Sequence, residues 1–240
     1  RNATAFAKLP AWFEVDDGTT LTFNDYKIRV DRLASGLLKA GVRKGDRLGI
    51  LGKNSLAYFM LYGAAAAMGA IVLPINWRLS AEEICFNLND CEPVLLFVDR
   101  EYQSLIQGKR EDLKSIRAFY NLKSNAGEFL DFTSLMNAKE PFDPAAEDIT
   151  DDQGLVIIHT AAVGGRPRGA LLSHANVIAA NAHLMHLFNA SAADVHLNLL
   201  PLFHIAGLVM ATSAFHVGAV NLNMSKFDAG KAVELIEDRK

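Results

Sequence analysis

Two kinds of apolar spacing alternate along the first hundred residues. Between Tyr26 and Leu38 apolar side chains recur every three to four positions, which predicts a helix with one buried face at residues 22–41. Short apolar runs predict buried strands at residues 48–51, 70–75 and 93–98. Helices are expected between them, at residues 55–68 and 80–90. This alternation is typical of a mostly parallel sheet with helices on both faces.

Polar residues mark the ends of these helices. Thr22 with Asp25, and Ser80 with Glu83, have the spacing of a capping box, in which side chains satisfy backbone N–H groups at a helix start. Gly41 follows the first helix, where glycine commonly adopts the left-handed conformation that ends a helix. These signals define the expected bounds of the two helices.

A second set of elements follows a polar connector at residues 139–153, which carries two prolines and a cluster of carboxylates. Strands are predicted there at residues 156–158, 195–200 and 219–222, and one more strand is predicted before the connector, at residues 116–120. Helices are predicted from residue 173 to about 189 and from about 228 through 236. We therefore expect a first α/β subdomain at residues 1–140 and the start of a second at residues 141–240.

Composition narrows the class of protein. Half of the 240 residues are hydrophobic and 21% are charged, so a substantial core is available. The net charge of −3 gives no electrostatic basis for nucleic-acid binding. The two cysteines, Cys85 and Cys91, are too few for a disulfide framework and lack metal-site spacing. We expect reduced thiols in a cytoplasmic protein without a secretory signal.

Two uncharged stretches, residues 58–75 and 197–222, are long enough to cross a membrane. The first is rich in alanine and glycine and contains Pro74, and the second contains Pro201 and two histidines. We predict buried helix-and-strand pairs there, and no integral membrane span.

The most informative stretch begins with the strand at residues 156–158. A loop of small residues follows, in which Gly164 and Gly165 allow a ligand to approach the main chain and Arg166 and Arg168 supply positive charge. Backbone N–H groups and guanidinium groups together suit a polyphosphate. An exposed basic turn would have the same composition, so composition alone leaves both interpretations open.

The whole string resembles the phosphate-binding loop of the acyl-adenylate-forming superfamily, which includes acyl-CoA synthetases, luciferases and peptide-synthetase adenylation domains. The matching residues are Thr160, Gly165, Pro167, Gly169, Leu171, Leu172, Ser173, His174 and Asn176. Arg166 and Arg168 stand where lysines are usual. The family's Ser-Gly-Thr-Thr core is replaced by Ala161, Ala162, Val163 and Gly164, so three hydroxyls are missing. Each hydrogen bond lost to a charged phosphate is worth about 1.5–3 kcal/mol.

Other segments carry the same resemblance. The string from Leu21 to Arg47, followed by Asn54-Ser55 and by Leu73-Pro74-Ile75-Asn76, is similar to the family's first subdomain. The segment Pro201 to Leu208 resembles a family motif in which a histidine, here His204, lies near the acyl-binding pocket. The resemblance implies the family's large N-terminal domain, with stacked, mostly parallel sheets flanked by helices.

The resemblance implies an acid–thiol ligase that uses ATP, Mg²⁺ and coenzyme A. A small carboxylic acid, fatty or aromatic, would form an acyl-adenylate and then pass to the thiol of coenzyme A. His204 would lie at the acyl pocket. The phosphates would be bound by Thr160, Ala161, Ala162, Val163, Gly164, Gly165, Arg166 and Arg168.

Family members are about twice as long as this chain. The later adenine-binding motifs and the mobile C-terminal domain with its catalytic lysine have no counterpart here. We therefore assign no catalytic residue and no metal ligand in this chain, and we expect it to be inactive by itself.

The alternative is a non-catalytic relative that binds an acyl group or a nucleotide, and the hydroxyl-poor loop favours it. A P-loop NTPase is excluded because no Gly-Lys-Ser/Thr is present, and no Gly-x-Gly-x-x-Gly opens a helix for dinucleotide binding. Carboxylates at residues 147–152, or His183 with His186, would make only an incomplete metal site.

Overall fold

The computed structural model describes residues 2–123, 128–138, 142–143, 148–160 and 166–238. They form two compact units, each assembled from separate segments of the chain. The central unit comprises Ile28–Gly52 and Ala57–Val177, and the terminal unit comprises Arg1–Lys27, Lys53–Leu56 and Ile178–Lys240. These units do not follow the expected division at residue 140, because strands near the two ends of the chain pair with each other. That subdomain boundary stays a prediction.

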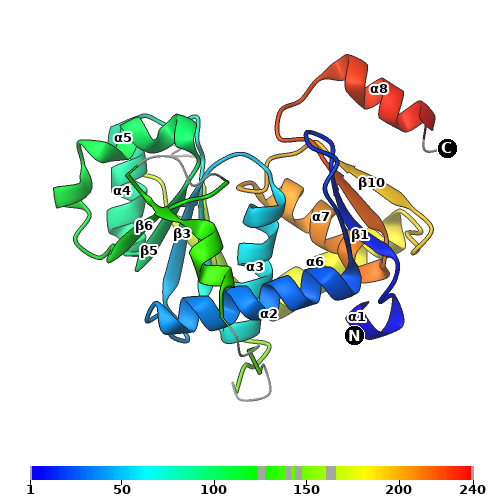
Figure 1. Cartoon of the computed structure of the whole chain (residues 1–240), viewed down its shortest axis with the longest axis horizontal. Helices are drawn as coiled ribbons and strands as arrows, with labels where there is room; N and C mark the ends of the chain where they lie inside the picture. The colour runs from blue at the N-terminus through cyan, green and yellow to red at the C-terminus, as the bar shows by residue number, and fades with distance from the viewer. Residues whose placement is uncertain (1, 124–127, 139–141, 144–147, 161–165, 239–240) are drawn as a thin grey trace. The chain divides into compact units, whose positions relative to one another are not determined.

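The central unit contains a seven-stranded sheet in the order β7-β6-β5-β3-β4-β8-β9 (Figure 1). Its strands are β3 Arg47–Leu51, β4 Ile71–Ile75, β5 Leu95–Val98, β6 Ala118–Asn121, β7 Leu130–Asp131, β8 Gly154–His159 and β9 Gly169–Ser173. All neighbours are parallel except β8 and β9. Every residue of β4 and β5 is buried, as their uninterrupted apolar runs predicted.

The three helices expected in this part of the chain are present as α2 Phe23–Lys39, α3 Leu56–Met68 and α4 Ala81–Cys91. A short helix, α5 Gln103–Gln107, and 3-10 turns at Arg100–Tyr102, Arg110–Asp112 and Phe132–Met136 were not predicted. Both predicted capping boxes are confirmed. The N–H of Asp25 donates to Thr22 Oγ1 over 3.1 Å, and the N–H of Ser80 donates to Glu83 Oε2 over 2.9 Å. Gly41 ends the first helix with φ +88°, in the left-handed region.

The terminal unit contains a four-stranded sheet in the order β10-β11-β1-β2. Its strands are β1 Pro10–Glu14, β2 Thr20–Thr22, β10 Val195–Asn198 and β11 Val220–Asn223, and only the β1–β2 pair is antiparallel. The remaining helices are α1 Asn2–Ala5, α6 His174–Leu187, α7 Ile205–Val217 and α8 Ala229–Asp238. The strands β1 and β2 were not predicted, because residues 1–20 have no long periodic pattern.

A buried carboxylate joins three strands of the terminal sheet. Glu14 accepts hydrogen bonds from Trp12 Nε1 over 3.0 Å, from Asn223 Nδ2 over 2.8 Å and from the N–H of Leu56. Asn223 Oδ1 in turn accepts from Asn198 Nδ2 over 3.1 Å. Buried polar groups are stable only when they are hydrogen-bonded, so this chain of contacts fixes how β1, β11 and β10 pair.

The two sheets confirm the predicted fold class, an α/β fold with mainly parallel sheets flanked by helices. The uncharged stretches form α3 with β4, and β10 with α7 and β11, as predicted. Among the residues that the structure describes, every helix is too short or too polar to cross a bilayer.

Candidate functional site

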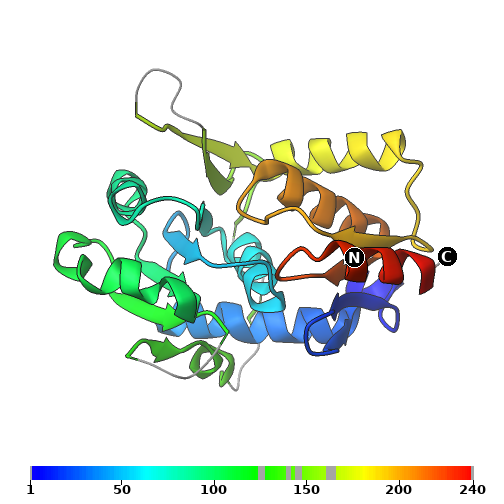
Figure 2. The same cartoon turned by 90° about the horizontal axis from the view of Figure 1, so that it is seen from above.

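The candidate phosphate loop connects β8 and β9, two strands that pair as a hairpin immediately before helix α6 (Figure 2). Strands β8 and β9 pair from Gly154 opposite Ser173 to His159 opposite Gly169. The sequence predicted β8 but treated Gly169 as the end of the loop and the following residues as a lead into the helix. β9 was missed because it is short and largely exposed, so it has no pattern of buried positions.

Hydrogen bonds close the loop at its base. The N–H of Thr160 donates to the carbonyl oxygen of Arg168 over 3.0 Å, and Thr160 Oγ1 donates to the same oxygen over 3.3 Å. Thr160, Arg166 and Arg168 are all exposed. The structure thus brings these three predicted residues together around one loop. Ala161, Ala162, Val163, Gly164 and Gly165 lie outside the described residues.

Arg166 has an identified neighbour within the central unit. Its guanidinium carbon lies 5.4 Å from the centre of the Phe86 ring, which α4 carries. An arginine at this distance from an aromatic face makes a cation–π contact. The Phe86 ring of α4 therefore contacts the guanidinium of Arg166, which is one of the two cations of the loop.

The hairpin leads directly into α6. The N–H of Asn176 donates to Ser173 Oγ over 3.3 Å, and the N–H of Ser173 donates to Asn176 Oδ1 over 3.0 Å, so Ser173 caps the helix as predicted. Burial lowers the pKa of His174, and the nearby Asp151 opposes that shift. Burial thus disfavours the charged form of the His174 side chain at the end of the hairpin.

His204 lies in the terminal unit, where it caps α7. Its Nδ1 accepts a hydrogen bond from the N–H of Ala206 over 3.2 Å, and its side chain is exposed. Because Nδ1 is an acceptor, a neutral His204 carries its proton on Nε2, which is the atom available to a ligand. The capping role was not predicted, since histidine is not a typical N-cap residue.

Asn54 fixes the segment that precedes His204. This buried amide donates from Nδ2 to the carbonyl oxygen of Leu200 over 2.8 Å and accepts at Oδ1 from the N–H of Leu202 over 2.7 Å. Gly207 packs against the same segment, since a Cβ there would lie 2.2 Å from the carbonyl oxygen of Pro201. In the sequence analysis Asn54 was only part of a matching string, and no role was predicted for it.

The terminal unit also has an apolar hollow of about 340 Å³, lined by residues of α6, β10 and α7 that include Met185, Val195 and Met210. Burial lowers the pKa of His196, which lines this hollow. His204 is not among the lining residues, so its predicted place at an acyl pocket stays a prediction.

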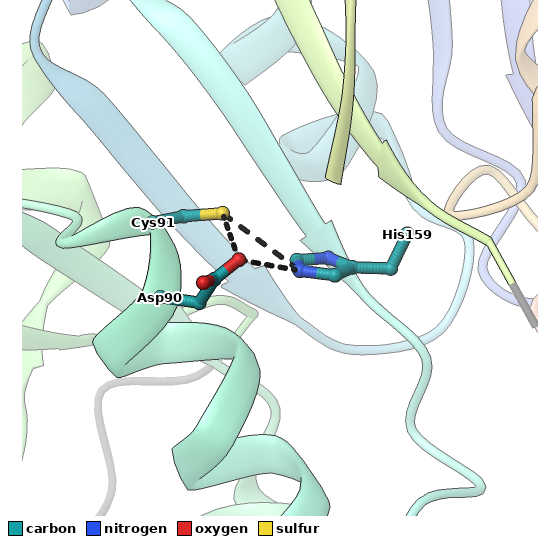
Figure 3. A group of neighbouring side chains, drawn as sticks. All are labelled: Asp90, Cys91 and His159. Atoms are coloured by element: carbon teal, nitrogen blue, oxygen red, sulfur yellow. Dashed lines mark hydrogen bonds and ion pairs between the residues drawn. The ribbon is translucent and has the colours of Figure 1, made fainter. Parts of the chain in front are cut away.

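One group of side chains has the chemistry of a metal site among the described residues. Figure 3 shows Asp90 and Cys91 at the end of α4, facing His159 at the end of β8. The sequence showed no such site, because Cys91 and His159 are 68 positions apart and meet only through the fold. Both cysteines are free, and burial, with the neighbouring Asp90, raises the pKa of the Cys91 thiol to about 11.

Known proteins resemble the chain along almost its whole length. A fatty acid–[acyl-carrier-protein] ligase, ScoC of Streptomyces coeruleorubidus, is 31% identical over 92% of this chain and 42% of its own. An indoleacetate–CoA ligase of Aromatoleum aromaticum is 31% identical over 88% of this chain and 41% of its own. This chain thus spans about two fifths of the length of these relatives.

A solved structure has the same fold. The inhibitor-bound N-terminal domain of FACL13 from Mycobacterium tuberculosis superposes with a TM-score of 0.91 and is 26% identical, over 99% of this chain and 58% of that one. The predicted correspondence to an N-terminal domain is therefore confirmed. The model of the AMP-binding enzyme family matches residues 1–240, and the chain belongs to that family.

Proposed function

We propose that the protein containing this chain is an AMP-forming acid–thiol ligase that works in the cytoplasm. Its carboxylic acid substrate, fatty or aromatic, attacks the α-phosphate of ATP, so that an acyl-adenylate forms and pyrophosphate leaves. The thiol of coenzyme A then attacks the acyl carbon and AMP leaves. The observation that carries the proposal is the pair of exposed arginines, Arg166 and Arg168, which precede β9 of the hairpin, in a chain of the AMP-binding enzyme family.

Within this proposal the hairpin binds the phosphates. Backbone N–H groups of residues 161–165 and the hydroxyl of Thr160 donate to phosphate oxygens, and Arg166 and Arg168 offset their charge. Arg166 has to leave Phe86 to do so. A cation–π contact at an exposed site is worth about 0.5–1 kcal/mol. A hydrogen bond to a charged phosphate is worth about 1.5–3 kcal/mol, so binding of ATP favours the move.

Mg²⁺ bound with ATP would neutralise part of the phosphate charge. Among the described residues of this chain we assign it no ligand, because the group formed by Asp90, Cys91 and His159 contains a thiol, which is too soft for Mg²⁺. At the other candidate segment, we propose that Nε2 of His204 contacts the acyl substrate.

A second candidate is a non-catalytic relative that binds an acyl group or a nucleotide without turnover. It is favoured by Ala161, Val163 and Gly164, which stand where the family loop has its three hydroxyls. Each of the three lost hydrogen bonds is worth about 1.5–3 kcal/mol of phosphate binding, and Arg166 and Arg168 add no further charge because they replace lysines.

Pyrophosphate release distinguishes the two candidates. The full-length protein is incubated with ATP, Mg²⁺ and one acid at a time from a panel of fatty and aromatic acids, with and without coenzyme A. Release that depends on the acid, followed by formation of a thioester, supports the ligase and identifies its substrate class. Binding of ATP without release under any of these conditions supports the non-catalytic relative.

A further inference from the structure

Three different ligand atoms converge at one point of the central unit (Figure 3). Nε2 of His159 lies 3.8 Å from Cys91 Sγ and 3.9 Å from Asp90 Oδ2, and the sulfur lies 3.9 Å from the same oxygen. The Cys91 sulfur and the Asp90 oxygen thus both approach Nε2 of His159. A catalytic Cys-His-Asp triad would place the thiol and the carboxylate on opposite nitrogens, so the cluster does not have that geometry.

The three distances form a nearly equilateral triangle. Its centre lies about 2.2 Å from each corner, which is close to the usual zinc distances of about 2.0–2.1 Å to nitrogen or oxygen and about 2.3 Å to sulfur. A zinc ion therefore fits among the side chains as they stand. Shifts of a few tenths of an ångström would bring the three atoms to the separations of a tetrahedral site, in which water would be the fourth ligand.

His159 provides an independent sign of a missing ligand. Its side chain is only 9% exposed, and its Nδ1 has no hydrogen-bond partner within the described part of the chain. Its Nε2 reaches a sulfur and a carboxylate oxygen only at distances too long for strong hydrogen bonds. A buried nitrogen without a close partner is costly, and a metal ion would give Nε2 such a partner, with the proton of the neutral ring on Nδ1.

The surrounding backbone keeps the space clear. Gly169 lies opposite His159 in the hairpin, and a Cβ at Gly169 would lie 3.4 Å from Cys91 Sγ and 3.6 Å from His159 Nε2. Arg47 Nε donates to the carbonyl oxygen of Cys91 over 2.8 Å and so fixes the end of α4. The cluster is thus positioned by a strand, a helix end and a glycine.

We propose that Asp90, Cys91 and His159 bind Zn²⁺. Thiolate, imidazole and carboxylate are all zinc ligands, and the sulfur disfavours Mg²⁺ and Ca²⁺. On binding, the metal replaces the proton of the Cys91 thiol, which passes to solvent, so that the two anionic ligands balance the charge of the ion. The bound ion joins α4 to the residue that immediately precedes Thr160.

The test uses the purified full-length protein after removal of metal with a chelator. Zinc binding is measured by competition with a chromogenic chelator, and Co²⁺ is added separately as a spectroscopic probe. We expect one Zn²⁺ per chain, and a thiolate-to-cobalt charge-transfer band that Zn²⁺ displaces. The cobalt band needs no variant, so it tests Cys91 as a ligand in the native protein.

Variants then identify the ligands. Cys91→Ala and His159→Ala should each weaken zinc binding at least 100-fold, and Asp90→Asn should weaken it about 10-fold because Asp90 is the most exposed of the three. Cys85→Ala, on the same helix, removes the other thiol and should leave the affinity and the cobalt band unchanged. Circular dichroism checks that each variant is folded.

The proposal is overturned if the native chain binds no zinc or shows no charge-transfer band. Zinc binding that survives Cys91→Ala would equally overturn it. Neither readout involves ATP or an acid, so failure here does not bear on the proposed ligase activity.

Discussion

The hairpin loop at residues 160–168 and the turn at residues 200–208 are both candidate ligand-binding segments, and they are held in different ways. The described contacts of the hairpin loop are at its base, between Thr160 and Arg168, and on one side, between Arg166 and Phe86. The turn is held by two hydrogen bonds to the buried side-chain amide of Asn54 and by the close packing of Gly207 against the carbonyl oxygen of Pro201.

The difference indicates two ways of binding. A charged ligand at the hairpin loop competes with the contact between Arg166 and Phe86, and this competition reduces the net affinity. A segment held by buried hydrogen bonds presents His204 in a fixed position and tolerates little change in its support. The two segments should therefore respond to mutation in opposite ways, the turn through stability and the hairpin through ligand affinity.

Gly207→Ala should have the largest effect. Its Cβ would lie 2.2 Å from the carbonyl oxygen of Pro201, so the turn or the start of α7 must shift, at a cost of about 3 kcal/mol. Urea unfolding measures the loss. The matched control is Gly230→Ala in α8, where the nearest atom is 3.4 Å away and the higher helix propensity of alanine should leave stability equal or raise it by up to about 1 kcal/mol. Equal effects at the two glycines would contradict this account of the turn.

Asn54→Ala should lower the free energy of unfolding by about 2 kcal/mol, because two hydrogen bonds of a buried amide are lost. The corresponding change in the hairpin, Thr160→Val, removes one exposed hydrogen bond and should cost less than about 1 kcal/mol. The same unfolding experiment measures both variants. A larger loss for Thr160→Val would reverse the comparison.

Changes to the hairpin cations should appear in ATP affinity instead. In the full-length protein, Arg168→Gln should weaken ATP binding about 10-fold, which corresponds to about 1.4 kcal/mol. Phe86→Ala releases Arg166 from its ring and should strengthen ATP binding about 2- to 5-fold. Calorimetric titration measures both, with Arg32→Gln on α2 as the control for loss of one exposed charge. Weaker binding by Phe86→Ala would indicate that the ring supports Arg166 in its binding position.

Lowering the pH should modestly reduce the stability of the fold near both segments. Burial lowers the pKa of His174, after the hairpin, and of His196, before the turn, below the ordinary 6.5. The folded state therefore binds fewer protons than the unfolded state, so stability is complete above pH 6.5 and decreases as the pH falls below it. Carboxylates with lowered pKa values, such as Asp17 and Glu83, affect the stability of the fold only below about pH 4.5.

Unfolding between pH 7.5 and 5.5, in the presence of a chelator, tests this expectation. His174→Gln and His196→Gln should each flatten the pH dependence. A profile unchanged by both variants would show that neither histidine is held neutral by the fold.

Local signals in the sequence were sufficient to predict much of the fold. The capping pairs at Thr22 and Ser80 predicted helix starts, because a cap depends on residues three positions apart. β1 and β9 were missed because each is short and depends on a partner strand for its stability.

For the candidate sites, too, the sequence predicted what depends on neighbouring residues and missed what depends on distant ones. Thr160, Arg166 and Arg168 were found because they are close together in the sequence. The contact between Arg166 and Phe86, and the group of Cys91 with His159, depend on how α4 packs near β8, which the spacing of residues does not reveal. The role of Asn54 depends on contacts with a segment almost 150 positions later.

The position of β1 has a consequence for how the chain folds during synthesis. β1 lies between β2 and β11, and its Glu14 bonds to Asn223, 209 positions later. The ribosome therefore releases β1 long before its parallel partner exists, whereas the parallel neighbours β3, β4 and β5 of the central sheet lie within about fifty residues of one another. The central sheet can form early, and β1 remains an unpaired strand edge, open to other chains or to a chaperone, until β11 emerges.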